Sequence, residues 1–211
     1  DGMILTMLLH MLRHFAYDRY RGFRSFSWLT GVALIWLVYI TGINGFMLVW
    51  DKLAQFVTVS TAELLDWIPI FKGVVIRNFI FEGHVNDRLF TLLAFVHLGA
   101  PLLVLMVMWI HVQRVPRAHT NPPKAIALWV TATFLILSLV RPVVSQGPAN
   151  LSVEVGALDF DWFYLPIYPL IYEWPLASLW GFLIGTSVFL YLLPWLPPKR
   201  GSKVIRHVAV R

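Results

Sequence analysis

The stretch that decides the fold is LFTLLAFVHLGAPLLVLMVMWIHVQR, residues 89–114. It is long, apolar and uncharged until its last residue, so it predicts a helix that crosses a membrane. Two histidines, His97 and His111, lie within it, fourteen residues apart. At about 100° per residue, fourteen steps fall within about 40° of complete turns, so both rings leave one face of the helix. At about 1.5 Å per residue they stand roughly 21 Å apart, close to the depth of the hydrocarbon layer.

These two histidines are the first candidate functional residues. Ionisable side chains inside a membrane are costly and usually have a function. Two imidazoles stacked across a bilayer suggest two axial ligands, one for each of two haem groups. The alternative is that both rings hydrogen-bond to neighbouring helices.

The composition is that of an integral membrane protein. Of the 211 residues, 58% are hydrophobic and 13% are charged, and the mean hydropathy is +0.70. Soluble domains carry about 25% charged residues. The segments do not alternate as the strands of a barrel do, so we expect an all-α transmembrane bundle. The absence of cysteine excludes iron–sulfur ligation, covalent haem attachment and disulfides within the chain.

Five apolar segments are expected to form the bundle, as one partial span and four full ones. The partial span, residues 3–15, is too short to cross a bilayer and looks like the second half of a helix that begins upstream. The four full spans are expected at 29–50, 89–114, 125–140 with an extension to Val144, and 175–195.

Two long connections are expected on the outer side. In the first, residues 51–88, the amphipathic segment TAELLDWIPIF predicts a short surface helix that Pro69 breaks. The second, residues 145–174, is expected to be a polar-to-aromatic loop that contains DFDWFYLPIY.

The net charge of +6 follows membrane topology. Segments 13–24, 112–124 and 199–211 hold twelve of the 17 Lys and Arg residues, and the two long connections hold nine of the 11 acids. Basic residues gather on the inner side of a membrane, so we assign the three basic segments to that side. Nucleic acid is therefore not an expected partner.

Gly31 and Gly45 in the span 29–50 repeat the fourteen-residue spacing of the histidines. Glycine lowers helix stability but lets another body approach the backbone closely. Ordinary helix packing is one explanation. A flat macrocycle at each of two depths also explains why the two spacings agree.

The topology pairs two of the histidines. His10 and His111 each precede an arginine, Arg13 and Arg114, by three residues. Both helices run from outside to inside, so the two rings are expected at one depth near the inner face. There they would ligate one haem b, with the arginines paired to its propionates. His97 lies about 21 Å further out, and its partner is expected upstream of the first residue.

With these residues in view, nearly all of the chain resembles the cytochrome b/b6 family of quinol–cytochrome c and plastoquinol oxidoreductases. HMLR at 10–13 resembles the end of the family's second helix, and the paired glycines followed by GFMLVWD resemble its third. TLLAFVHLGAP through His111 resembles the fourth helix, including the proline four residues after its first histidine. The remaining similar segments are HTNPP, GPAN, DFDWFYLPIYPLIYEWP and LLPWLPPKRGSK.

The resemblance implies a division into N-terminal-like haem-binding helices, 1–124, and C-terminal-like helices, 125–211. It implies two haems b and a subunit that transfers electrons across the bilayer between quinone or quinol and other redox subunits, of the iron–sulfur or cytochrome c type. Lipid and a second copy of the chain, in a homodimer, are further implied partners. The expected location is an energy-transducing membrane, in particular the bacterial inner membrane. Both ends resemble those of a fragment or a split subunit.

The outer motif departs from the family pattern. It reads Phe160-Asp161-Trp162-Phe163 where the family has Pro-Glu-Trp-Tyr, whose Glu is tied to quinol proton release. Asp161 keeps a carboxylate with a shorter reach and is our candidate proton acceptor, with a helix cap or a salt bridge as the alternative. Trp162 is a candidate quinone contact. On the inner side His119, with Arg114, is a candidate quinone ligand, and a solvated loop histidine is the alternative.

Two other functions remain open. The chain could be a membrane anchor and electron wire for a peripheral dehydrogenase or reductase, without outer quinol oxidation, which the altered motif favours. It could also be a haem-free structural subunit. An outer-site quinol inhibitor distinguishes the electron wire from the quinone-linked subunit described above. A b-type haem spectrum distinguishes both of these from the haem-free subunit.

Overall fold

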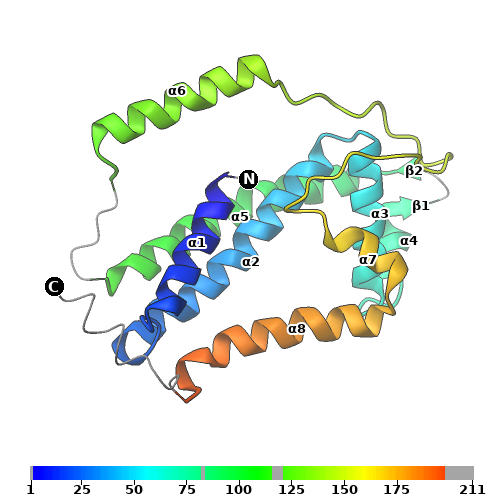
Figure 1. Cartoon of the computed structure of the whole chain (residues 1–211). Helices are drawn as coiled ribbons and strands as arrows, with labels where there is room; N and C mark the ends of the chain where they lie inside the picture. Colours follow the sequence, from blue (N-terminus) through cyan, green and yellow to red (C-terminus); the bar gives the residue numbers. More distant parts are fainter. Residues whose placement is uncertain (1, 82–83, 116–120, 198–211) are drawn as a thin grey trace.

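The computed structural model describes residues 2–81, 84–115 and 121–197 (Figure 1). Five helices correspond to the five apolar segments that the sequence predicted: α1 (Gly2–Ala16), α2 (Ser25–Leu48), α5 (Asp87–Gln113), α6 (Lys124–Val140) and α8 (Leu176–Leu192). The other elements are η1 (Gly22–Arg24), α3 (Lys52–Asp66), α4 (Val74–Phe79), β1 (Ile80–Phe81), β2 (His84–Val85), α7 (Ile167–Glu173) and η2 (Leu193–Trp195).

The prediction of an all-α membrane bundle is confirmed, although the number of full spans differs. Three helical segments of the described chain are long and apolar enough to cross a bilayer: Gly22–Leu48, Asp87–Gln113 and Leu176–Trp195. α1 and α6 are apolar but shorter. The chain is therefore an integral membrane protein.

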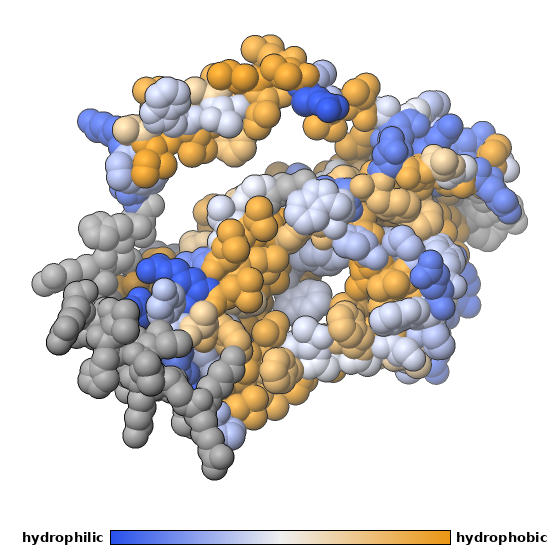
Figure 2. Space-filling view, in the orientation of Figure 1, coloured by the Kyte–Doolittle hydropathy of each residue, from blue (hydrophilic) through white to orange (hydrophobic). Residues whose placement is uncertain are grey.

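α6 is the expected span that falls short. Its 17 residues reach about 26 Å, somewhat less than a hydrocarbon layer. The predicted extension to Val144 is wrong, because Pro142 cannot continue a helix and keeps Arg141 out of the helical conformation. Figure 1 shows α6 apart from the other helices, and Figure 2 shows apolar side chains along it. A surface of this kind is suited to lipid.

The centre of the molecule is the antiparallel pair α2 and α5, which pack along their lengths. α1 lies beside α2, and α8 contacts α2 from another side (Figure 1). The small elements α3, α4, α7 and the β1–β2 pair gather at one end, which is the acidic end of the bundle. We call this the outer end and the opposite one the inner end, after the predicted topology.

The first outer connection holds a longer and more buried helix than the sequence predicted. α3 begins at Lys52, where the carboxylate of Asp51 accepts a hydrogen bond from Ala54 N (2.9 Å) and caps the helix. Its residues Ala54, Val57 and Ser60 are almost fully buried. The helix ends at Asp66, before Pro69. Of the surface helix predicted over 61–71, residues 61–66 are thus the last part of a packed helix, and turns follow them.

The second connection, predicted to be a loop, contains α7. Tyr168 and Ile171 of α7, with Leu165 just before it, pack against α3 and the outer ends of α2, α5 and α8. This outer core consists of Met47, Leu53, Val57, Leu89, Leu93, Leu165, Tyr168, Ile171 and Leu179. The Tyr168 hydroxyl hydrogen-bonds to Thr61 Oγ1 (2.8 Å), and burial raises its pKa to about 12.

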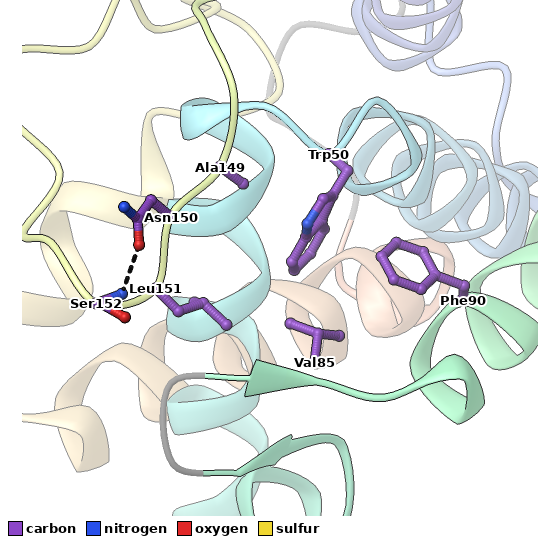
Figure 3. A pocket seen from close by; sticks show the side chains of 7 residues that line it. All are labelled: Trp50, Val85, Phe90, Ala149, Asn150, Leu151 and Ser152. Carbon is purple, nitrogen blue, oxygen red and sulfur yellow. Dashed lines mark hydrogen bonds between the residues drawn. The ribbon is translucent and has the colours of Figure 1, made fainter.

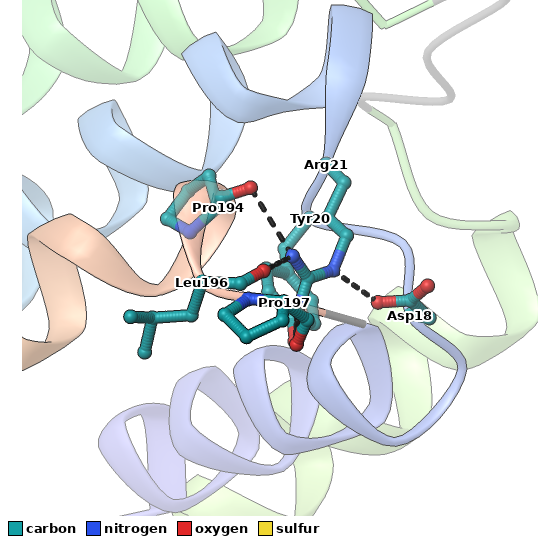
Figure 4. A network of polar contacts seen from close by, with 6 residues as sticks. All are labelled: Asp18, Tyr20, Arg21, Pro194, Leu196 and Pro197. Carbon is teal, nitrogen blue, oxygen red and sulfur yellow. Dashed lines mark hydrogen bonds and ion pairs between the residues drawn. The ribbon is translucent and has the colours of Figure 1, made fainter. Parts of the chain in front are cut away.

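A smaller core closes the inner end, where Arg21 joins two distant segments (Figure 4). Its guanidinium pairs with Asp18 (2.7 Å) and donates to the backbone carbonyl oxygens of Pro194, Leu196 and Pro197. Those carbonyl oxygens follow α8 and have no donor from the helix, so Arg21 supplies the hydrogen bonds that they would otherwise lack. The core beside it consists of Tyr20, Trp28, Val32 and Leu193.

Candidate functional site

The two glycines of α2 face the two histidines of α5. A Cβ built on Gly31 would lie 3.4 Å from Cε1 of His111, and a Cβ built on Gly45 would lie 3.4 Å from Cε1 of His97. Because both helices carry the same fourteen-residue spacing, the antiparallel pair repeats one contact at two depths. The structure therefore brings together four of the residues that the sequence singled out.

His111 is the inner member and has a hydroxyl partner. Its Nδ1 lies 2.9 Å from Thr30 Oγ1 on α2. The ring is half-buried. Arg114, which ends α5, places its guanidinium over the ring of Phe26, 4.9 Å from the centroid. Arg114 thus lies one turn beyond His111, at the end of α5, and its role toward a propionate stays a prediction.

His97 is the outer member, and it differs from His111 in one respect. Its Nδ1 is buried and has no hydrogen-bond partner within the part of the chain that the structure describes. Buried polar atoms are almost always paired. An unpaired imidazole nitrogen on a helix face inside a membrane indicates a ring that needs a partner beyond those that the present side-chain orientations supply.

His10 approaches the inner pair from α1. It lies within electrostatic range of His111, and the ligation of one haem by both rings stays a prediction. Its ring also contacts the ring of His14 edge-on, with 4.5 Å between centroids. His10 is exposed and His14 is half-buried, so α1 offers two imidazoles near the inner end. Arg13 is exposed in the last turn of α1.

The outer motif is held as a capped turn. Asp161 Oδ1 accepts the backbone N–H groups of Phe163 (2.9 Å) and Tyr164 (2.6 Å). This is the capping geometry that we named as the alternative to proton transfer. Trp162 is 65% exposed, with its ring edge-on to Phe163, so it is available for a contact outside the chain. The catalytic role of Asp161 stays a prediction.

Tyr164 fastens this motif to α2, which the sequence reasoning missed. Its backbone oxygen accepts a hydrogen bond from the Tyr39 hydroxyl (2.7 Å), and the two rings stack 6.0 Å apart. A Cβ on Gly42 would lie only 2.1 Å from Cε1 of Tyr164. Burial, and then the charge of Asp161, raise the pKa of Tyr164, so its phenol stays neutral near neutral pH.

A second clip holds the GPAN segment against α3. Gln55 donates to Asn150 O (2.9 Å) and accepts from Asn150 N (2.7 Å). The carboxylate of Asp51 accepts from Gln146 N (3.0 Å). Both Asp51 and Gln55 are buried, so their polar groups depend on this segment. These buried hydrogen bonds hold the first residues of the second connection against α3.

Between this segment and the bundle lies a cavity of about 280 Å³. Trp50, Val85 and Phe90 form one side of it and the segment from Ala149 to Ser152 the other (Figure 3). The rings of Trp50 and Phe90 meet edge-on, 5.0 Å apart. The cavity opens at the outer surface, two turns of α5 beyond His97.

The remaining inner candidate, His119, lies outside the described residues. Thr30 and Asn44 were also missed, although their signal was in the sequence: each comes directly before one of the paired glycines. The contacts of Gly42, Asp51 and Gln55 carried no such signal, because their partners lie roughly a hundred residues away in the chain.

The donor set fits a haem group. The imidazoles stand at two depths on one helix face, and the glycine opposite each leaves room for a flat ring. Within the described residues, no group of three or more His, Asp or Glu side chains could hold a free metal ion. Axial ligation needs only one imidazole from each side of a macrocycle, which this arrangement can supply.

The sequence comparisons agree with this arrangement. The family model described as cytochrome b (N-terminal)/b6/petB matches residues 1–146. Cytochrome b/c1 of Bradyrhizobium diazoefficiens is 25% identical over 90% of this chain and 32% of its own length. Cytochrome b of Rickettsia conorii is 23% identical over 90% of this chain and 55% of its own. The chain thus spans at most about half the length of these curated relatives.

Similarity of structure extends over more of the chain. A solved chain titled "Hyperthermophilic respiratory Complex III" has a TM-score of 0.65, covering 92% of this chain and 60% of its own, at 22% sequence identity. The two share a fold. Since the family model also covers most of the sequence, including both glycine–histidine pairs, this chain belongs to the cytochrome b/b6 family.

Proposed function

We propose that this chain is a di-haem electron-transfer subunit that carries electrons across the membrane between quinone and partner redox subunits. Membership of the family implies haem b as its cofactor. Two haems, the quinone and the redox partners, of the iron–sulfur or cytochrome c type, belong to the proposal. So do the inner-side placement of segments 13–24, 112–124 and 199–211 and the bacterial inner membrane as the location.

The observation that carries the proposal is the repeated glycine–histidine contact. His111 opposite Gly31 and His97 opposite Gly45 lie at the same Cβ-to-Cε1 separation of 3.4 Å, at depths about 21 Å apart. A single-site protein would need this contact once. Its repetition at a spacing close to the hydrocarbon depth favours two redox centres that together bridge the bilayer.

Each residue then has a definite role. Haem b, when bound, supplies a carrier that gains and loses one electron at a time. His111 and His10 would hold the inner group, and His97 the outer one with a ligand from outside the described residues. The apolar surface of α2 and α5 excludes water from both depths, while Arg13 and Arg114 supply positive charge for propionates at the inner rim.

The test is spectroscopic and uses membranes that contain the intact complex. We expect a b-type α-band in the reduced-minus-oxidised spectrum and two components in a potentiometric titration. His97→Ala should remove one component and His111→Ala the other. A spectrum without the band, or two variants that each keep both components, would overturn the proposal.

The second candidate, an anchor and electron wire for a peripheral oxidoreductase, draws support from the outer motif. Asp161 Oδ1 is occupied by two backbone N–H groups, and Phe163 has no hydroxyl. An inhibitor of outer quinol oxidation distinguishes the two functions. Blocked reduction of the outer component by quinol supports the leading proposal, and unaffected reduction supports the electron wire.

A further inference from the structure

The dipeptides Thr30-Gly31 and Asn44-Gly45 occupy equivalent positions on α2, fourteen residues apart. Each glycine faces its histidine on α5 at the same Cβ-to-Cε1 distance. The residue before each glycine therefore has the same register toward the facing imidazole. The inner position carries a hydroxyl, and the outer position carries an amide.

At the inner position the direction of the hydrogen bond can be assigned. Thr30 Oγ1 lies 3.0 Å from Phe26 O and 3.1 Å from Ser27 O, which can only accept. The single hydroxyl proton is therefore used within α2. The remaining contact, 2.9 Å to His111 Nδ1, then has the imidazole as donor. With its proton on Nδ1, His111 presents a free lone pair at Nε2.

At the outer position both potential partners are unpaired. Asn44 is 5% exposed, and neither its Oδ1 nor His97 Nδ1 has a hydrogen-bond partner in the described chain. Leaving a buried polar group unpaired costs free energy. One acceptor and one potential donor, each unpaired, thus stand at the positions where Thr30 and His111 meet in the inner pair.

We propose that Asn44 is the positioning residue of the outer histidine: its side-chain oxygen accepts the Nδ1 proton of His97 and leaves Nε2 for haem iron. The proposal rests on the proposed function above. It assigns to Asn44 the part that Thr30 plays toward His111. An amide oxygen carries no proton of its own, so it holds the imidazole in a single tautomer.

Thr58 of α3 is the competing candidate, because α3 packs against α2 and Thr58 Oγ1 is the third buried side-chain atom without a hydrogen bond in the described chain. A bond between Thr58 and Asn44 would leave His97 Nδ1 unpaired. Thr58 also has no counterpart at the inner end, whereas Asn44 has one in Thr30. The register therefore favours Asn44 as the partner of His97.

The expected signature is a change in one midpoint potential. A hydrogen bond that an axial histidine donates makes its ring a stronger donor and stabilises oxidised iron. Asn44→Leu keeps the shape of the side chain and removes the acceptor. In membranes that contain the complex, it should raise the midpoint of the outer component and leave the inner one unchanged. Thr30→Val should raise the midpoint of the inner component and leave the outer one unchanged. Thr30→Ser, which keeps the hydroxyl, should leave the inner midpoint at its wild-type value.

Two further variants complete the test. Asn44→Ala removes the acceptor with less volume and should shift the outer midpoint in the same direction if Asn44→Leu does not accumulate. Thr58→Val should leave both midpoints unchanged. An outer midpoint that responds to Thr58→Val, or that ignores both Asn44 variants while two components are present, overturns the inference alone. Wild-type membranes without two components overturn the proposed function instead.

Discussion

The inner and outer ends of the α2–α5 pair repeat one backbone contact but differ in what surrounds it. At the inner end His111 bonds to Thr30, and the neighbouring α1 contributes two more imidazoles. At the outer end His97 Nδ1 has no hydrogen-bond partner among the described residues, and the helix ends are packed under α3 and α7. The helix pair sets the spacing of the two sites, while the elements beyond it determine how each site is completed.

The largest effect should come from separating the two imidazoles of α1. His10→Ala should abolish the inner haem component, because this ring is the proposed ligand opposite His111. His14→Ala should keep it. Haem content and a potentiometric titration measure both. If His14→Ala loses the inner component and His10→Ala retains it, the inner ligand is the half-buried ring, and our assignment from the Arg13 spacing is wrong.

The next test disturbs each end separately by replacing its glycine with a larger residue. A Cβ at Gly31 or Gly45 already reaches 3.4 Å from a ring, so the branched side chain of valine overpacks the interface by about 1–3 kcal/mol. Gly31→Val should lower the occupancy of the inner component and Gly45→Val that of the outer one. Optical spectra of membranes give both occupancies.

Gly99 provides the matched control on α5, because a Cβ there would contact nothing within 4 Å. Gly99→Ala should keep both components. Loss of both components from either valine variant alone would show that the two depths are coupled, contrary to the independence that the repeated contact implies.

A smaller, purely outer effect is expected from Gly42→Ala. The added Cβ would overlap the Tyr164 ring at 2.1 Å, so the ring and the Asp161 turn must move off α2. We expect a loss of about 1–3 kcal/mol in stability, together with a change at the proposed outer quinone site and none in the inner component. Thermal unfolding in detergent measures the first, with Gly185→Ala as the control at an open position.

The sequence predicted the helices α2 and α5 but not the elements that pack over their outer ends. Apolar length and the fourteen-residue spacings are properties of single helices, so they predicted that Gly31 and Gly45 share one helix face and that His97 and His111 share another. The contact between these two faces is seen only in the structure. The burial of α3 depends on Asp51 and on contacts with Leu165 and its neighbours, which lie roughly a hundred residues away in the chain. No periodicity within one segment reports such a contact.

The outer motif shows the same limit at one residue. The carboxylate of Asp161 could be read from the sequence either as a proton acceptor or as a cap, because both uses require the same side chain. Only the positions of Phe163 N and Tyr164 N distinguish them. The hydroxyl of Tyr39 and the missing side chain of Gly42, which hold Tyr164 in place, lie in another helix and carry no motif.

The smallest effect is expected from the Arg21 network, which should contribute to stability at the inner end but not to the haem site there. Hydrogen bonds to Asp18 and Tyr20 raise the pKa of Arg21 although burial opposes its charge, so the guanidinium stays charged across the physiological range. Arg21→Met should lower stability by about 1–2 kcal/mol, because the carbonyls after α8 lose their donor. Arg24→Met, whose guanidinium lies over Phe23, is the control. Since the network fastens η2 and not His111, the inner midpoint potential should not move. If it does, the end of α8 contributes to the inner site, and the contrast between a helix pair that defines the sites and elements that only cover them fails at this end.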